Sequence, residues 1–162
     1  MSPREETVTV RQGVPADLPA VSRIEARSFD DPWSDITLGG ELLADTLRLP
    51  LVAMLGDQAD GKPAGYLMAW KVVDQLHVLN IAVDPGLRRG GIATALLLEA
   101  ARQALEIGLS EMTLEVRRSN DSGRAFYDRH GFIEVGVREG YYADTGEDAV
   151  IMNCPLARLN GL

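Results

Sequence analysis

The stretch that decides the fold reads Leu79-Asn80-Ile81-Ala82-Val83-Asp84-Pro85-Gly86-Leu87-Arg88-Arg89-Gly90-Gly91-Ile92-Ala93. Its apolar first half predicts a buried strand over residues 75–83, and Asp84-Pro85-Gly86 marks the end of that strand. The residues that follow predict a long helix over residues 91–107, which Gly108 closes. A strand that turns through glycines directly into a helix leaves the first amides of the helix unpaired beside the end of the strand.

The glycine-rich turn suits a phosphate group. Amides at a helix N-terminus carry partial positive charge, glycines allow a ligand to approach the backbone closely, and Arg88 and Arg89 add full charge. Neither the nucleoside-triphosphate loop G-x-x-x-x-G-K-[ST] nor the dinucleotide string G-x-G-x-x-G is present. The string R-x-x-G-x-A, from Arg88 to Ala93, therefore predicts a pyrophosphate site. A surface turn with solubilising arginines is the alternative interpretation.

The remaining sequence predicts strands that alternate with helices, which indicates an α/β domain with a mixed sheet. Strands are expected at residues 8–10, 51–55, 64–73, 75–83, 112–116, 132–137 and 149–154. Helices are expected at residues 15–29, 34–47, 91–107 and 122–130. A length of 162 residues fits a single domain with one core. Residues 1–6 and 157–162 are expected to be flexible tails.

Composition narrows the class of partner. The formal net charge of −8 opposes unspecific nucleic-acid binding and favours a basic protein. No apolar run is long enough to span a membrane, and the acidic N-terminus argues against a secretory signal. The single cysteine, Cys154, excludes an internal disulfide and favours the cytoplasm. His77 and His130 are the only histidines, so no metal site is expected.

Four further strings make the chain resemble a known superfamily, the GNAT N-acetyltransferases. They are Asp31-Pro32-Trp33-Ser34, Leu79 to Pro85, Leu114-Glu115-Val116-Arg117-Arg118-Ser119-Asn120, and Gly140-Tyr141-Tyr142 leading to Glu147-Asp148-Ala149. Together with the 88–93 turn they are similar to the RimI-type branch, which acetylates the N-terminal alanine of a small-subunit ribosomal protein. The resemblance covers Thr7 to Pro155. It implies a GNAT fold, a single domain whose central mixed, mostly antiparallel twisted sheet is flanked by helices.

The resemblance also implies roles for particular residues. Acetyl-CoA would be the acetyl donor, and the backbone of Ile81, Ala82 and Val83 would hold its pantetheine arm. Its pyrophosphate would lie on Arg88, Arg89, Gly90, Gly91, Ile92, Ala93 and Thr94. Asn120 and Tyr127 would also contact the cofactor, with Glu115 as general base and Tyr127 as general acid. Trp33, Tyr141 and Tyr142 would line the groove for the acceptor peptide. Ala93 replaces a glycine of the family pattern, and Gly140 and Ala143 alter the substrate loop.

The residues by themselves leave other interpretations open. Glu115 alternates with apolar Leu114 and Val116, which also fits a solvated strand carboxylate paired with Arg117. Tyr127 could be a core tyrosine that packs with Phe126 and Phe132. Trp33, Tyr141 and Tyr142 could be partly exposed packing residues.

The pKa of the acceptor amine favours a protein N-terminus. A protein α-amine has a pKa of about 8, so its deprotonation costs about 1.4 kcal/mol at neutral pH. Deprotonation of a lysine side chain costs more than about 4 kcal/mol at the same pH. We therefore expect direct acetyl transfer to the N-terminal amine of a basic ribosomal protein, by a monomer or weak homo-oligomer that does not contact nucleic acid. A small-molecule amine or a lysine side chain is the nearest alternative acceptor. A non-catalytic acetyl-CoA-binding module is the alternative of another class.

Overall fold

A computed structural model describes residues 7–43, 45–56, 61–88 and 90–162. The elements are β1 (Val8–Gln12), α1 (Leu18–Ser28), α2 (Asp35–Glu41), β2 (Arg48–Leu55), β3 (Lys62–Val72), β4 (Gln75–Val83), α3 (Ile92–Glu106), β5 (Glu111–Arg117), α4 (Asp121–Arg129), β6 (Ile133–Tyr142) and β7 (Glu147–Pro155). This order of helices and strands is the one predicted. The expected tail at 1–6 and the predicted site residue Arg89 lie outside the described residues. Every described helix is too short or too polar to cross a membrane.

The strands form one seven-stranded sheet in the order β1-β2-β3-β4-β5-β7-β6. The β1–β2, β5–β7 and β6–β7 pairs are antiparallel, whereas β4 and β5 run parallel. In the parallel pair, His77 lies opposite Thr113 and Val78 lies opposite Leu114. This register confirms the expected α/β fold with a mixed, mostly antiparallel sheet.

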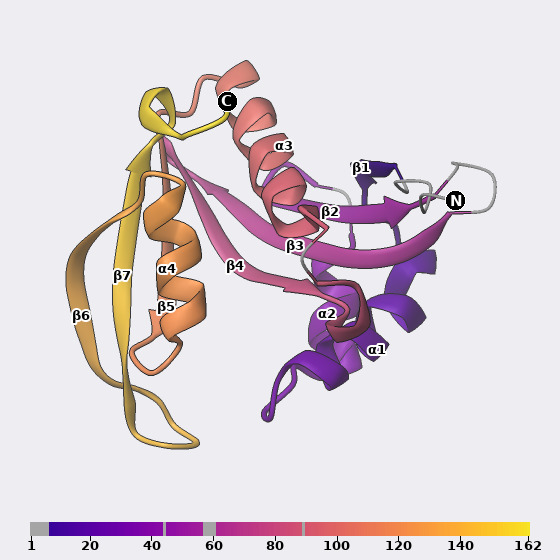
Figure 1. Ribbon diagram of the computed structural model, residues 1–162, viewed down its shortest axis with the longest axis horizontal. Helices are drawn as coiled ribbons and strands as arrows, with labels where there is room; N and C mark the ends of the chain where they lie inside the picture. The colour runs from indigo at the N-terminus through magenta and orange to yellow at the C-terminus, as the bar shows by residue number, and fades with distance from the viewer. Residues whose placement is uncertain (1–6, 44, 57–60, 89) are drawn as a thin grey trace, which may run out of the picture. The chain divides into compact units, whose positions relative to one another are not determined.

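The chain divides into two compact units, of which the first comprises Met1–Ala69 and Asn80–Ala100. Within it, α1 and α2 lie on one side of strands β2 and β3, and the first part of α3 lies on the other (Figure 1). Buried side chains such as Ile24, Leu51 and Leu96 fill the space between these layers. These three side chains are each 0% exposed, so the core of this unit lies between the helices and the sheet.

The second unit comprises Trp70–Leu79 and Ala101–Leu162. In β5, Met112, Leu114 and Val116 are buried, while the residues between them are half-exposed, which confirms the predicted alternation of Glu115 with its neighbours. Helix α4 packs on the sheet of this unit through Tyr127, whose ring lies 5.4 Å from that of Phe132.

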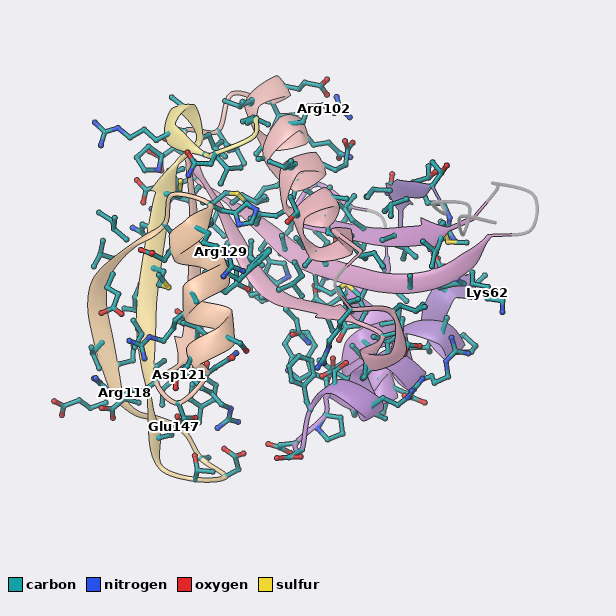
Figure 2. The ribbon with its side chains drawn as sticks, viewed as in Figure 1. Lys62, Arg102, Arg118, Asp121, Arg129 and Glu147 are labelled. Carbon is teal, nitrogen blue, oxygen red and sulfur yellow. The ribbon has the colours of Figure 1, made fainter. Side chains whose placement is uncertain are left out.

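The C-terminal segment packs against the second unit, whereas many charged side chains of that unit are exposed. At the C-terminus, Leu156 and Leu159 are buried, and the amide of Asn160 donates to the carbonyl of His130 at 3.0 Å. Charged side chains elsewhere, such as Arg102 and Arg129, point away from the ribbon (Figure 2).

Two predicted boundaries were wrong. Helix α2 ends at Glu41 rather than near residue 47, because Gly39 and Gly40 weaken the helix and the chain turns at Leu42. Strand β6 runs to Tyr142 rather than to residue 137, so both tyrosines of the predicted substrate loop belong to a strand end.

Asp17 is a buried carboxylate that fixes the entrance to α1. Both of its oxygens accept hydrogen bonds from Arg11, at 2.7 and 2.8 Å, and one also accepts from the Val14 amide at 2.9 Å. The Arg11 guanidinium holds the pKa of Asp17 below its usual value, and the Val14 amide acts in the same direction. A lowered pKa means that this stabilisation is present above the ordinary aspartate pKa and is lost as the pH falls through the folded value.

We therefore expect Asp17→Asn to lower the free energy of unfolding at pH 7 by roughly 1–3 kcal/mol, because the charge-assisted hydrogen bonds are lost. At about pH 3, below the ordinary aspartate pKa, the difference should shrink, because the unfolded wild-type chain then binds a proton that the folded state resists. Urea unfolding of both proteins at the two pH values measures this. An equal difference at both would contradict the assigned role of the charge.

Candidate active site

The turn after β4 is held by a buried carboxylate. The Asp84 amide donates to the carbonyl of Ala64 at 2.8 Å, and the Asp84 side chain accepts from the Gly86 amide at 3.0 Å. Arg27 of α1 forms an ion pair with the same carboxylate at 2.9 Å. The side chain of Asp84 thereby fixes the direction in which the chain leaves the strand, and Arg27 is a contributor that the sequence interpretation missed.

Gly91 directly precedes helix α3, and its carbonyl accepts from the Ala95 amide at 2.9 Å. Gly91 has a φ of 73°, a conformation that favours glycine, and both Gly90 and Gly91 are exposed. The amides of Ile92 and Ala93 precede the first hydrogen bond of the helix. Gly90 and Gly91 have no side chains of their own to block an anionic group from these amides, which fits the predicted pyrophosphate site. Arg88 is exposed beside this turn.

Strand β4 lies very close to β3 at Ala82. A Cβ atom on Gly65 would lie 2.8 Å from the carbonyl oxygen of Ala82 and 3.1 Å from a side-chain carbon of Ile92. Only glycine fits between this strand and the start of α3. Gly65 therefore sets the position of the segment 81–83 that is predicted to hold the pantetheine arm.

Trp33, predicted to contact the acceptor, is half-buried in the segment between α1 and α2. Its amide donates to Oε1 of Glu25 at 2.9 Å. Ser34 follows it and caps α2, because its Oγ accepts from the Thr37 amide at 3.2 Å, as the sequence predicted.

Glu115 is the most strongly held of the predicted catalytic side chains. Its Oε2 lies 3.1 Å from Nε2 of His77 on β4, and its Oε1 accepts from Nε of Arg138 on β6 at 3.1 Å. Its side chain is 14% exposed, so the carboxylate is sheltered but reachable. The alternative in which Glu115 pairs with Arg117 is wrong, since Arg117 pairs elsewhere.

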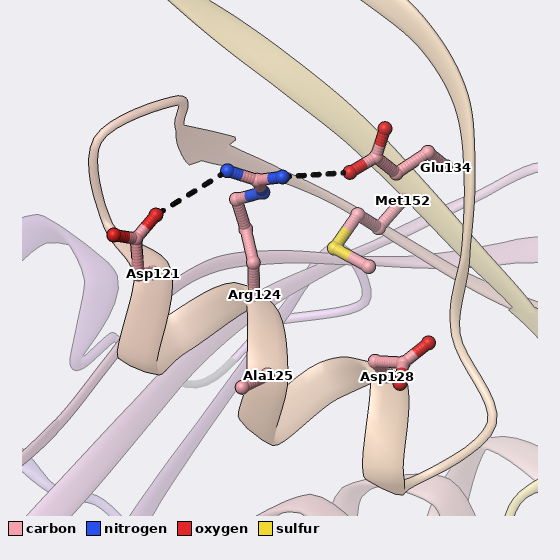
Figure 3. A pocket seen from close by; sticks show the side chains of 6 residues that line it. All are labelled: Asp121, Arg124, Ala125, Asp128, Glu134 and Met152. Atoms are coloured by element: carbon pink, nitrogen blue, oxygen red, sulfur yellow. Dashed lines mark hydrogen bonds and ion pairs between the residues drawn. The ribbon is translucent and has the colours of Figure 1, made fainter.

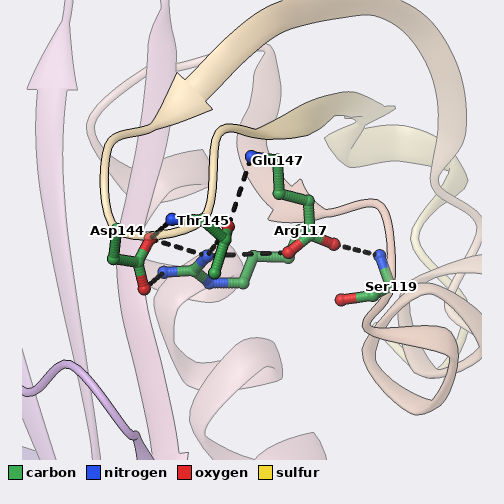
Figure 4. A network of polar contacts seen from close by, with 5 residues as sticks. All are labelled: Arg117, Ser119, Asp144, Thr145 and Glu147. Atoms are coloured by element: carbon green, nitrogen blue, oxygen red, sulfur yellow. Dashed lines mark hydrogen bonds and ion pairs between the residues drawn. The ribbon is translucent and has the colours of Figure 1, made fainter.

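Arg117 organises the turn between β6 and β7 instead (Figure 4). Its guanidinium binds both oxygens of Asp144 at 3.0 and 3.1 Å and lies 3.6 Å from Glu147. It also covers the ring of Tyr142, with its central carbon 4.0 Å from the ring centroid. Burial raises the pKa of Tyr142 to about 12, so its hydroxyl is neutral at physiological pH. Tyr141 packs edge-on against Tyr142 and stays exposed.

Tyr127 is buried, and its ring contacts Phe126 and Phe132, as the core interpretation predicted. Among the residues that the structure describes, its hydroxyl has no hydrogen-bond partner, and burial raises its pKa above the ordinary value. Asn120 takes a role that the sequence interpretation missed, because its Oδ1 caps α4 by accepting from the Gly123 amide at 2.9 Å.

The predicted residues thus fall into two groups, one in each unit. The first unit holds the cofactor residues 81–83 and 88–94, apart from the undescribed Arg89, together with Trp33. The second unit holds Glu115, Asn120, Tyr127, Tyr141 and Tyr142. Within the described ranges, no cluster of three or more metal-ligating side chains is found.

A pocket on the α4 side of the second unit contains none of the predicted residues. It is lined by Asp121, Arg124, Ala125, Asp128, Glu134 and Met152 (Figure 3). Arg124 spans it and forms ion pairs with Asp121 at 3.5 Å and Glu134 at 3.3 Å. Because Arg124 already pairs with Asp121 and Glu134, we assign this pocket no part in the reaction.

Comparison with known proteins identifies the family of this chain. The pattern of the Acetyltransferase (GNAT) family matches residues 18–132. The chain belongs to the GNAT family. GNAT proteins are acetyltransferases that use acetyl-CoA, so this chain is an N-acetyltransferase enzyme, and the non-catalytic alternative is set aside.

Individual relatives are similar over between 61% and 87% of the chain. The [ribosomal protein bS18]-alanine N-acetyltransferase of Escherichia coli is 36% identical over 143 residues, which is 87% of this chain and 93% of that protein. An N-alpha-acetyltransferase of Sulfurisphaera tokodaii is 40% identical over 112 residues, 61% of this chain and 66% of that protein. The crystal structure of the Escherichia coli ribosomal-protein-alanine enzyme superposes with a TM-score of 0.82 at 34% identity, covering 93% of this chain and 94% of that one.

The contacts around Glu115 lead to a prediction about the GNAT reaction. Replacing His77 with Ala removes one of the two side chains that hold the carboxylate, so kcat should fall about tenfold, as expected for one hydrogen bond to a charged group. His77→Gln, which can still donate, should recover part of the loss. Steady-state kinetics with acetyl-CoA and an alanine-initiated peptide measure both values.

Gln75→Ala is the matched control. Gln75 lies on the same strand, two residues before His77, but its amide donates to Glu111 at 3.2 Å rather than to Glu115. This variant should keep the wild-type kcat. Equal losses in the Gln75 and His77 variants would show that the strand as a whole, rather than the contact with Glu115, had been disturbed.

Proposed function

We propose that this enzyme transfers the acetyl group of acetyl-CoA to the N-terminal amine of a protein, and that its substrate is the N-terminal alanine of ribosomal protein bS18. The observation that carries the proposal is the 36% identity with the Escherichia coli bS18-alanine enzyme over 93% of that protein's length. The net charge of −8 adds support, since it favours a basic protein partner.

Glu115 is the proposed general base. Acetyl-CoA supplies a thioester, and the neutral amine of the acceptor attacks its carbonyl carbon. The new C–N bond forms as the C–S bond breaks, and the surplus proton of the amine passes to the Glu115 carboxylate directly or through a water molecule. His77 and Arg138 keep both oxygens of this carboxylate in a fixed orientation. An α-amine is the suitable acceptor, because its neutral form costs only about 1.4 kcal/mol at pH 7.

Tyr127 is the proposed general acid. Its raised pKa keeps the phenol protonated over the physiological range, so the proton is always available. The same raised pKa disfavours a free phenolate, and the transfer to the leaving thiolate must therefore accompany cleavage of the C–S bond. The unpaired hydroxyl agrees with this role, since no other described group competes for its proton.

The first unit would hold the acetyl donor. The start of α3 offers the amides of Ile92 and Ala93 to the diphosphate, and Gly90 and Gly91 leave that approach open. The strand segment 81–83 would bind the pantetheine arm through its backbone, and Gly65 keeps that segment in place. Thr94 is a further proposed cofactor contact in this unit, and Asn120 and Tyr127 are those proposed in the second unit.

The acceptor assignment predicts a clear order of substrates. A peptide with the bS18 N-terminal sequence, beginning with alanine, should be acetylated at least about tenfold faster per unit concentration than the same peptide with a blocked N-terminus and one free lysine. The reason is the higher cost of deprotonating lysine. Mass spectrometry of the products, with a panel of small amines alongside, measures this order. Faster turnover of a small amine would overturn the protein acceptor.

The catalytic assignment predicts losses in kcat without loss of cofactor binding. Glu115→Gln removes the base and should lower kcat by about 10²–10⁴-fold, and Tyr127→Phe should lower it in the same direction. Isothermal titration with coenzyme A should give near wild-type affinity for Glu115→Gln. Full activity in both variants would mean that other groups move the two protons.

A further inference from the structure

Glu25 is a buried carboxylate in α1 that the proposed chemistry does not use. Only 1% of its surface is exposed. A polar group removed from water costs free energy unless it is hydrogen-bonded, and an unpaired charge costs more. Glu25 takes part in no ion pair with any residue in the described part of the chain, so neutral donors must satisfy it.

Three donors from three separate segments converge on Glu25. Its Oε1 accepts from the Trp33 amide at 2.9 Å, and its Oε2 accepts from Nδ2 of Asn80 at 2.8 Å. The hydroxyl of Tyr66, a fully buried residue of β3, also donates to Oε2. Nδ2 of Asn80 lies 3.2 Å from that hydroxyl as well, so the side chains of Glu25, Tyr66 and Asn80 form a closed triangle. Burial raises the pKa of Glu25, while the bonds from Trp33 and Asn80 oppose that rise.

The bond to Trp33 is the important one, because the segment around it has little else to hold it. Residues 30–32 are exposed. Among the described residues, the contact from the Trp33 amide to Glu25 is the only hydrogen bond that joins residues 30–33 to another part of the chain. This segment leads directly into α2 through the cap at Ser34. Glu25 therefore anchors the backbone at Trp33.

The bond to Asn80 connects the same carboxylate to the strand that would bind the cofactor. Asn80 directly precedes the segment 81–83. The backbone of β4 is also held by its place in the sheet, so it does not depend on Glu25 alone. The Glu25 carboxylate thus connects the weakly held segment that carries Trp33 to the firmly held strand β4.

We propose that Glu25 is a positioning residue for the acceptor: it fixes the Trp33 segment relative to β4, so that the N-terminal residues of the acceptor protein find their binding surface already formed. This inference rests on the proposed function, in which Trp33 contacts the acceptor. Stability alone is a weak reason for the cluster, because well-packed apolar side chains in place of a buried polar group are often equally stable.

Replacing Glu25 with Gln tests the role at nearly constant shape. The carboxamide keeps one acceptor oxygen but turns an NH2 group toward either the Trp33 amide or Asn80, so one of these bonds is lost. We expect KM for an alanine-initiated peptide to rise about tenfold, the equivalent of one hydrogen bond, while kcat changes by less than about twofold. Affinity for coenzyme A, measured by calorimetry, should stay within about threefold of wild type, because β4 keeps its sheet pairing.

Asp17→Asn is the matched control, since it also converts a buried carboxylate of the first unit to an amide. Asp17 bonds to Arg11 and to the Val14 amide and has no contact with the Trp33 segment. It should lower stability without raising the peptide KM. If Glu25→Gln does not fold, Tyr66→Phe removes one donor while leaving the ring in the core, and its peptide KM should rise about threefold.

Hydrogen exchange of the Trp33 amide, measured by NMR, gives a readout independent of activity. The amide should be protected in the wild type and should exchange at least about tenfold faster in Glu25→Gln. A folded Glu25→Gln variant with a wild-type peptide KM overturns the inference, as does an equal rise in KM for Asp17→Asn. A wild-type protein that acetylates no peptide overturns the proposed function, and this inference with it, whatever the amide exchange shows.

Discussion

The candidate cofactor site depends on how the chain leaves β4. A buried aspartate, Asp84, binds the amide of Gly86 and the guanidinium of Arg27, while its own amide remains paired to β3. These bonds stop the strand at Val83 and direct the following residues into the start of α3. Because a helix begins there through Gly91, unpaired amides lie close to the end of the strand. A single turn would therefore supply both the backbone edge and the anion site of the proposed binding site for a long, phosphate-bearing donor.

Glu115 and Glu25 differ in the side chains that hold their carboxylates. Glu115 lies between His77 and Arg138, so cationic or potentially cationic side chains surround it at the surface of the second unit. Glu25 has only neutral donors and is almost fully enclosed. The first carboxylate stays reachable from the surface, with its side chain 14% exposed. The second is suited to holding other groups in place.

Much of the fold follows from local patterns in the sequence. The apolar run ended by Asp84-Pro85-Gly86 gave β4 with its predicted bounds, and the alternation around Glu115 gave the correct buried face of β5. The error in α2 has a local cause, because the apolar pattern continued past Gly39 and Gly40 while the helix did not. The tyrosines of β6 were placed in a loop because Arg138, Glu139 and Gly140 interrupt the apolar pattern after Val137, whereas the chain turns only at residues 143–146.

The sequence alone determined that a strand turns through glycines into a helix, and its strings identified the GNAT family. Only the tertiary structure decided which side chains surround the two glutamates. His77 and Glu115 are 38 residues apart, and Glu25 and Asn80 are 55 residues apart. Local patterns report periodicity and helix caps, which act over a few residues, whereas these contacts depend on strand order and register. Glu115 meets His77 because β4 and β5 pair in parallel with His77 opposite Thr113, a choice that no neighbouring residue encodes.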